Sequence, residues 1–148
     1  STFYFCTNLN QNIQIPNGVT SMAYTFSECY NLNQNIQIPD SVTSMGGTFY
    51  YCARLNQNIQ IPSSVTNMYY TFYYCTNLNQ SITILSNKVT SATGCFSSTS
   101  APKNVFIPFK NSDMTNSATF NSFVSAGYLT SAGVSTGQNG VTVYDLNT

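Results

Sequence analysis

The sequence contains no histidine and no tryptophan, and charged side chains are very scarce. Four basic and four acidic residues make up 5% of its 148 residues, whereas charged residues form about 25% of an ordinary globular domain. With a net charge of zero, the chain has no field that would attract nucleic acid or an anionic membrane. The absence of histidine also removes the most frequent general base of enzymes and a frequent zinc ligand.

The few acidic residues are far apart along the chain. Glu28, Asp40, Asp113 and Asp145 lie in different contexts, although glycoside hydrolysis needs two facing carboxylates and a calcium site needs several together. Serines and cysteines abound without a histidine that would activate them. Cysteine pairs with the Cys-x-x-Cys spacing of zinc sites are absent as well. We therefore expect a protein that is not an enzyme and holds no metal and no cofactor.

The sequence shows neither a transmembrane run nor a signal peptide. Its solubility has to come from asparagine, glutamine, serine and threonine, a composition that favours an extracellular, cell-surface or virion-surface location. The chain begins at Ser1 in the middle of a repeat and without an initiating methionine. Because a repeat protein needs a cap at each end, we expect a processed product or a piece of a longer protein. We expect no nucleic-acid partner and no insertion into a membrane.

What the chain does have is a phrase, LNQNIQIP, that returns every 23 residues. It stands at Leu9–Pro16, Leu32–Pro39 and Leu55–Pro62, and a variant, LNQSITIL, stands at Leu78–Leu85. A fixed period of this length is typical of a solenoid, in which each short coil stacks on the next. The predicted repeat region, 1–109, consists of repeats 1–23, 24–46, 47–69 and 70–92 and a degenerate repeat over 93–109. Lys88, near the end of repeat 70–92, marks a one-residue insertion.

Each repeat combines a strand pattern with a turn pattern. Ile13 and Ile15 alternate with polar residues, which predicts a short strand, and stacked strands build a parallel sheet. The Phe-x-x-Cys-x-x-Leu spacing of three predicts a short helical or 3₁₀ turn on the opposite side. The outward positions of the strands form columns of amides that can hydrogen-bond along a ladder. The columns include Asn12, Gln14, Asn35, Gln37, Asn58, Gln60 and Thr83.

Four cysteines, Cys6, Cys29, Cys52 and Cys75, occupy the same position of successive repeats and should form a column. Neighbouring coils lie about 4.8 Å apart, and a disulfide needs Cα atoms roughly 4.4–6.8 Å apart. Pairing is therefore possible in distance, but side chains stacked in parallel do not point at one another. We expect free, buried thiols here and at Cys95.

Beyond Phe109 the repeat pattern stops and a different pattern follows. Phe120, Phe123 and Tyr128 share one helical face within the stretch 118–128, and residues 141–146 alternate like a strand. Phe106 and Phe109 put bulky apolar groups where earlier repeats are polar, which suggests that something covers them. We expect residues 110–148 to form a small C-terminal α/β cap.

The repeat phrase F-x-x-C-x-x-L-x-x-I-x-I-P resembles the BspA-like class of leucine-rich repeats. The resemblance covers four units and a worn fifth one, with isoleucine, phenylalanine, methionine and cysteine in most apolar positions instead of leucine. It implies surface-exposed or secreted proteins of host-associated microbes and their viruses, often used for adhesion, and no catalytic activity. The predicted fold is therefore an α/β repeat solenoid, a leucine-rich-repeat-like right-handed coil with a short parallel sheet on one face and short helical turns on the other.

Positions that differ between the repeats indicate where a ligand could bind. Tyrosines gather in the third and fourth repeats outside the inward-facing pattern, and exposed tyrosine suits sugar rings and protein surfaces. The predicted ligand-binding residues are Tyr50, Tyr51, Arg54, Tyr69, Tyr70, Tyr73 and Tyr74. The amide columns of the sheet face are the alternative site. In a different interpretation, the tyrosines stack between coils and only stiffen them.

We expect a non-catalytic adhesion module that binds a glycan or protein of a host or neighbouring cell. The alternative is a structural repeat unit of an extracellular appendage or virion, with its aromatic surface in contacts with further copies or other chains.

Overall fold

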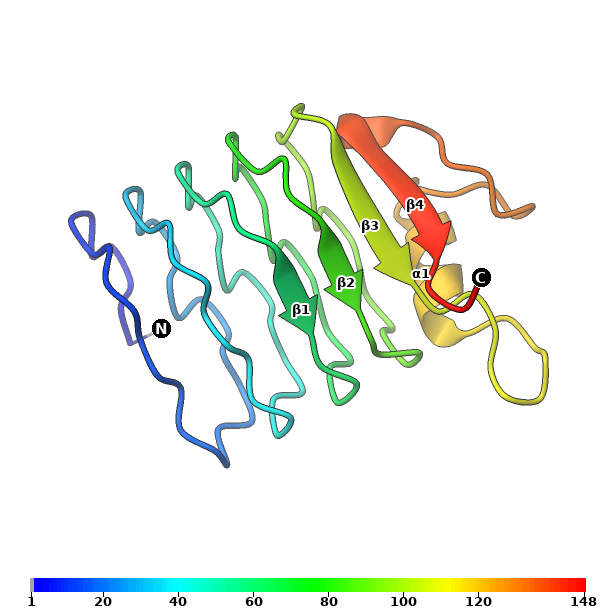
Figure 1. The fold of residues 1–148 in the computed structure, drawn as a ribbon, viewed down its shortest axis with the longest axis horizontal. Coiled ribbons are helices and arrows are strands. Elements are labelled where there is room, and N and C mark those ends of the chain that lie inside the picture. Colours follow the sequence, from blue (N-terminus) through cyan, green and yellow to red (C-terminus); the bar gives the residue numbers. More distant parts are fainter. Residues whose placement is uncertain (1) are drawn as a thin grey trace.

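The computed structural model describes residues 2–148, which contain four short strands, one α-helix and one 3₁₀ turn. The strands form one parallel sheet in the order β1-β2-β3-β4. Figure 1 shows successive segments of the chain side by side, from the N-terminus in blue to the sheet, with β4 beside β3. The elements are β1 Ile59–Ile61, β2 Ile82–Ile84, β3 Lys103–Ile107, α1 Ala118–Ser125, η1 Gln138–Gly140 and β4 Val141–Asp145.

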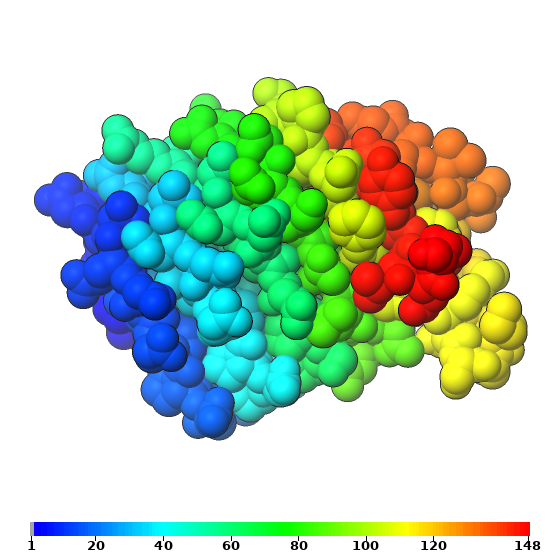
Figure 2. All heavy atoms as spheres, in the orientation of Figure 1, coloured from blue at the N-terminus to red at the C-terminus, as the bar shows by residue number. Residues whose placement is uncertain are grey.

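Five segments, numbered one to five, are residues 2–23, 24–46, 47–69, 70–92 and 93–109. Equivalent backbone groups of neighbouring segments are joined by hydrogen bonds, most of which run from an N–H to a carbonyl of the following segment, while some run back, as from Thr43 N–H to Thr20 O at 2.8 Å. The N–H of Met22 donates to the carbonyl of Ser44, and the N–H of Met45 donates to that of Asn67, both at 2.9 Å. The N–H of Met68 donates to Ser91, one residue further along, because the extra residue at position 88 lies between them. Figure 2 shows the segments as successive bands of side chains.

The strand prediction is correct for the third and fourth repeats and wrong for the first two. Among the described residues, strands begin only at β1, and the ladder is longest between β3 and β4, where five residue pairs match. In segment one, Ile13 and Ile15 are only half-buried, and in segment two Ile38 is half-buried although Ile36 is buried. The parallel ladder thus forms next to the C-terminal region and does not extend to the first segment.

The opposite side of each segment is built from consecutive β-turns, so the predicted short helical turns are wrong for residues 2–109. In segment two, Thr25 N–H donates to Met22 O, and Cys29 N–H donates to Phe26 O, both at 3.1 Å. Between these partners the backbone φ of Tyr24 is 55° and that of Glu28 is 60°. A left-handed third residue is the mark of a type II turn. A spacing of three residues fits both structures, since both close with a bond from residue i+3 to residue i.

The core is a set of columns in which equivalent side chains lie on one another. Five phenylalanine rings stack with centroids 5.4–5.8 Å apart and planes within 9°. All five cysteines are free, as expected, and the thiols of Cys29, Cys52 and Cys75 donate to backbone carbonyls of the preceding segment at 3.0–3.1 Å. Such bonds satisfy the weak S–H donor inside the core. The ring column consists of Phe3, Phe26, Phe49, Phe72 and Phe96.

The C-terminal residues close the last segment, with a helix in the expected stretch 118–128 and a strand at its expected place. Helix α1 begins after Ser117, whose hydroxyl accepts a hydrogen bond from Phe120 N–H at 3.0 Å. The ring of Tyr128 meets Phe96 edge-on, at 84°, and its hydroxyl accepts a bond from the Phe96 N–H at 2.8 Å. Tyr128 therefore ends the phenylalanine column. Its hydroxyl also satisfies the N–H of Phe96, whose equivalents in earlier segments are satisfied by a carbonyl of the following segment.

Lys103 fastens the end of segment five to the C-terminal region. Its side chain is buried, and the ammonium donates to backbone carbonyls of Thr99 at 3.1 Å and of Asn139 at 2.7 Å. A third carbonyl, that of Ala101, accepts as well. Burial lowers the pKa of Lys103 to about 8. Three carbonyl acceptors match the three donors of an ammonium group.

Over residues 2–148, helices of the length and apolarity needed to cross a membrane are absent.

The cysteine column makes stability depend on pH. Burial raises the pKa of Cys29 to about 11 and that of Cys52 well above its ordinary value of 9.0. The pKa of each thiol is higher in the folded chain than in the unfolded chain. The free energy of unfolding is therefore at its full value below pH 9 and falls as the pH rises from 9 through the folded pKa. We expect the free energy of unfolding to fall by about 1.4 kcal/mol per pH unit above 9 for a thiol such as that of Cys52. Urea unfolding at pH 7 and pH 10 under reducing conditions measures it.

The control is Cys52→Ala, which removes one buried thiol and keeps the tyrosines that also titrate at alkaline pH. Its loss of stability between pH 7 and pH 10 should be smaller than that of the parent chain. Equal losses in the two proteins would show that the buried thiol does not cause the effect.

Candidate ligand-binding surfaces

Six of the seven residues predicted for the first site come together as a cluster of rings on the turn side. Tyr50 stacks on Tyr73 at 4.8 Å and 12°, and Tyr51 stacks on Tyr74 at 4.5 Å and 18°. Tyr70 also contacts this stack, with its ring centroid 5.1 Å from that of Tyr73, and Tyr69 lies 4.1 Å from Tyr70. We call this set the tyrosine cluster: Tyr50, Tyr51, Tyr69, Tyr70, Tyr73 and Tyr74.

The tyrosine cluster is only partly buried and spans two segments. Tyr69 is 38% exposed and Tyr74 is 41% exposed, while the other rings are half-buried. In segment five the positions of Tyr73 and Tyr74 are taken by Ser97 and Ser98, so no ring continues the stack there. The rings of Tyr73 and Tyr74 thus border the smaller Ser97 and Ser98, and the aromatic surface ends at segment five.

The hydroxyls of Tyr50, Tyr51 and Tyr70 remain protonated at neutral pH, because the pKa of each is raised above its ordinary value. Burial is the main factor that raises the pKa of Tyr50 and of Tyr51, and the hydrogen bond with Tyr69 is the main factor that raises the pKa of Tyr70. A protonated phenol both donates and accepts hydrogen bonds. The cluster therefore offers flat apolar faces with neutral polar rims.

Two tyrosines rest on glycines of the following segment. A side chain built on Gly47 would place its Cβ 2.2 Å from the ring of Tyr24, and one built on Gly94 would lie 1.8 Å from the ring of Tyr70. All four residues have φ between 53° and 62° and share one position of the repeat. Tyrosine and glycine alternate there, so each ring lies over a backbone without a side chain.

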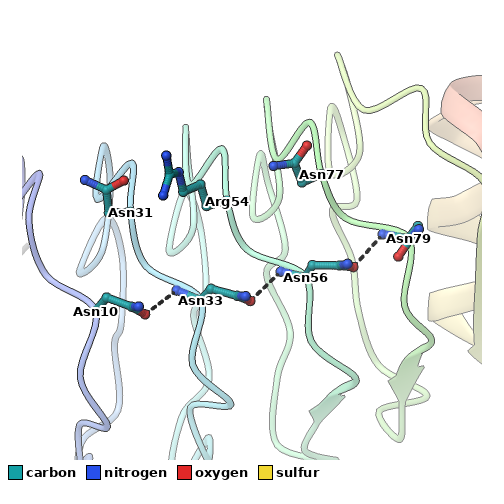
Figure 3. A pocket seen from close by; sticks show the side chains of 7 residues that line it. All are labelled: Asn10, Asn31, Asn33, Arg54, Asn56, Asn77 and Asn79. Carbon is teal, nitrogen blue, oxygen red and sulfur yellow. Dashed lines mark hydrogen bonds between the residues drawn. The ribbon is translucent and has the colours of Figure 1, made fainter.

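Arg54, the seventh predicted residue, lines a different feature. It stands between Asn31 and Asn77, above a row of asparagines that hydrogen bonds connect (Figure 3). This asparagine depression is open, has a volume of about 660 Å³ and is lined by Asn10, Asn31, Asn33, Arg54, Asn56, Asn77 and Asn79.

The lower row of the depression is a continuous ladder. The side-chain oxygen of Asn10 accepts a hydrogen bond from the backbone N–H of Asn33 at 2.9 Å. In the same way the oxygen of Asn33 accepts from Asn56 N–H at 2.9 Å, and that of Asn56 accepts from Asn79 N–H at 3.0 Å. This asparagine is the second residue of each LNQ phrase. We expected ladders two and four residues later, at the outward strand positions. The identical slot in four repeats was the signal that could have identified it.

The amide columns of the sheet face line a second, smaller depression. It has a volume of about 460 Å³ and includes Asn35, Gln37, Asn58, Gln60 and Thr83. Asn12 is exposed outside it, and Gln14 instead lines a hollow at the first segment. Only Asn58 links segments here, by accepting from Ser81 N–H at 2.9 Å, whereas Gln37 bonds to Asn35 of its own segment. The continuous amide ladders expected on this face are therefore wrong.

Groups of three or more acidic, cysteine or histidine side chains that could hold a metal ion are absent from residues 2–148. The stretch 133–137 reads Gly-x-Ser-x-Gly, a spacing also found around nucleophilic serines. In this structure the hydroxyl of Ser135 accepts the N–H of Val143 at 2.7 Å and faces its carbonyl at 3.2 Å. Ser135 thus holds the loop against β4.

The family described as "Mycoplasma protein of unknown function, DUF285" matches residues 1–109 of the chain. The chain belongs to this family. The DUF285 match ends at the residue where we placed the end of the repeat region, and it contains both the tyrosine cluster and the asparagine depression. None of the curated proteins and none of the solved structures matches the chain significantly.

The alternation of tyrosine and glycine can be tested with Gly47→Ala. The added methyl group meets the ring of Tyr24, and alanine at a φ of 62° is itself strained, so we expect the variant to be about 1–3 kcal/mol less stable. Urea unfolding of Gly47→Ala, Tyr24→Ala and the double variant gives the coupling energy. In the Tyr24→Ala background the cost of Gly47→Ala should fall to the backbone strain alone. An unchanged cost would show that the ring does not rest on Gly47.

Proposed function

We propose that the chain is a non-catalytic adhesion module at a cell or virion surface, which binds a glycan or protein of a host or neighbouring cell through the tyrosine cluster. The repeat region, 1–109, forms a BspA-like, leucine-rich-repeat-like solenoid, and residues 110–148 cap it. The support for the solenoid is the set of backbone bonds between equivalent positions and the columns of stacked side chains. The extracellular location rests on the scarcity of charge.

The single observation that carries the binding proposal is the tyrosine cluster. Soluble proteins rarely gather this many aromatic rings at a surface unless a partner covers them. Tyr69 and Tyr74 present ring area to solvent, and their neighbours fix them from below. Rigid rings lose little entropy on binding and offer a hydroxyl beside an apolar face. A neutral sugar ring or an uncharged protein patch fits such a surface.

The alternative function is a structural repeat unit of an appendage or virion. Two observations favour it. The stacking of Tyr50 on Tyr73 and of Tyr51 on Tyr74 links neighbouring segments and stiffens them. The first segment also keeps an apolar hollow of about 260 Å³, lined in part by Phe3, Ile13 and Val19, that another chain could fill. In this function the tyrosine cluster is buried in the native assembly.

The two functions are separated by a glycan array with the variant Tyr73→Ser/Tyr74→Ser. Serine fits the backbone, because segment five has Ser97 and Ser98 at these positions, with Ser98 at the same φ of about 60°. If the tyrosine cluster binds sugar, we expect the bound signal to fall at least tenfold, since tenfold corresponds to about 1.4 kcal/mol and the variant removes two contact rings. Fluorescence of the bound, labelled protein is the readout.

Tyr144→Ala is the matched control, because Tyr144 is also an exposed tyrosine, stacked on Phe106 at the far end of the molecule. It should bind as the parent chain does. Binding that survives the serine variant would place the site outside the tyrosine cluster. Absence of binding to any glycan and to any protein of an intact cell surface would favour the structural unit.

A further inference from the structure

The asparagine depression is lined by hydrogen-bond donors whose orientation is fixed. The side-chain oxygens of Asn10 and Asn33 each accept a backbone N–H and, in addition, the amide of a glutamine, Gln34 at 3.2 Å and Gln57 at 2.9 Å. These bonds settle which end of each amide is oxygen. The NH₂ groups of Asn10, Asn33 and Asn56 have no partner among residues 2–148. The ladder thus leaves a row of oriented, unused donors.

Arg54 adds a charge to this row. Its guanidinium is exposed and forms no ion pair within the described part of the chain, and none of the four acidic residues lines the depression. Glu28, on the preceding segment, is engaged by the hydroxyls of Tyr4 and Tyr30 at 3.2 and 2.9 Å. The one cation of the repeat region at this surface is therefore available to an anion.

Arg54 replaces an asparagine of the repeat. The same position holds Asn31 one segment earlier and Asn77 one segment later. Figure 3 shows the three side chains in one row, with Arg54 in the middle and the ladder below. The amide oxygen of Asn31 is open, since its nitrogen donates to Thr7 O at 2.7 Å. A charged donor is thus flanked by amides that both donate and accept.

We propose that the asparagine depression binds a carboxylate-bearing sugar, with Arg54 on the carboxylate and the asparagine amides on the hydroxyls. A guanidinium and a carboxylate form two parallel hydrogen bonds, a geometry that ammonium groups do not offer. Sugar hydroxyls need donors and acceptors close together, which the amides of Asn31 and Asn77 supply. The volume of about 660 Å³ lies in the range of ordinary ligand sites. This site is independent of the tyrosine cluster.

An acidic peptide would fit the depression less well. Its carboxylates would engage Arg54, but it has few hydroxyls for six asparagines, so most of the oriented amides would lose water without gaining a partner. A buried polar group without a partner weakens binding. The hydroxyl-rich ring of a uronic acid uses both kinds of group. Selectivity for the sugar over a peptide of equal charge is the signature that the geometry predicts.

The test is isothermal titration of the whole chain at low salt with trigalacturonate. Two probes serve as references: its methyl ester, which keeps the rings and removes the charge, and triglutamate, which keeps three side-chain carboxylates and removes the rings. We expect trigalacturonate to bind at least tenfold more tightly than either. Arg54→Gln should weaken its binding about tenfold or more, because a hydrogen-bonded charge is lost. Asn77→Ala should weaken it less, through one amide.

Both substitutions are at exposed side chains that hold no other residue, so the fold stays intact, and unfolding curves check this. Lys88→Gln is the charge-matched control, since Lys88 is exposed and does not line the depression. It should leave binding unchanged. Equal binding of triglutamate, equal binding of the methyl ester, no binding of trigalacturonate, or full binding by Arg54→Gln would each overturn the proposal. The glycan-array result for Tyr73→Ser/Tyr74→Ser tests the tyrosine cluster alone, so the two proposals can fail separately.

Discussion

The structure depends on one constraint: each segment must stack on the next with equivalent residues in register. Backbone N–H groups donate to carbonyls of the neighbouring segment, as from Met22 to Ser44 and from Met45 to Asn67, and this fixes the register. Once it is fixed, every side chain meets its counterparts. Phenylalanine rings stack nearly parallel, thiols reach a carbonyl of the preceding segment, and asparagine oxygens accept the next backbone N–H. A single period therefore satisfies apolar and polar groups together.

The proposed binding surfaces lie where the segments depart from this uniformity. The core columns are nearly invariant, since a ring of another size would disturb both neighbours. On the turn side, serine, glutamate and tyrosine exchange freely, and tyrosines in two adjacent segments make the aromatic cluster. At the asparagine depression, one arginine replaces an asparagine and brings a charge to a neutral row. The repeat provides the frame, and the departures from it supply the chemistry.

The period of 23 residues made the stacked arrangement, the phenylalanine column and the free thiols predictable, because a column follows from any position that repeats. The helix near residue 118 and the strand at residue 141 were predictable from local pattern. The turns were not, since a spacing of three suits a 3₁₀ turn and successive type II turns equally, and the left-handed φ of Tyr24 leaves no trace in a pattern of apolar residues. Arg54 was placed with the tyrosines because it is close to Tyr51 in sequence, whereas the chain direction after Cys52 turns it toward Asn31.

The alternation of Tyr24, Gly47, Tyr70 and Gly94 at one position has a consequence for how such a chain can change length. Removing residues 47–69 would bring Tyr24 against Tyr70, so the ring of Tyr24 would lose the glycine beneath it, while Tyr70 would keep Gly94. Removing two segments together keeps every tyrosine over a glycine. A deletion that removes residues 47–69 thus keeps these contacts only if it extends over a neighbouring segment, a length of 46 residues, although the unit visible in the sequence is half as long.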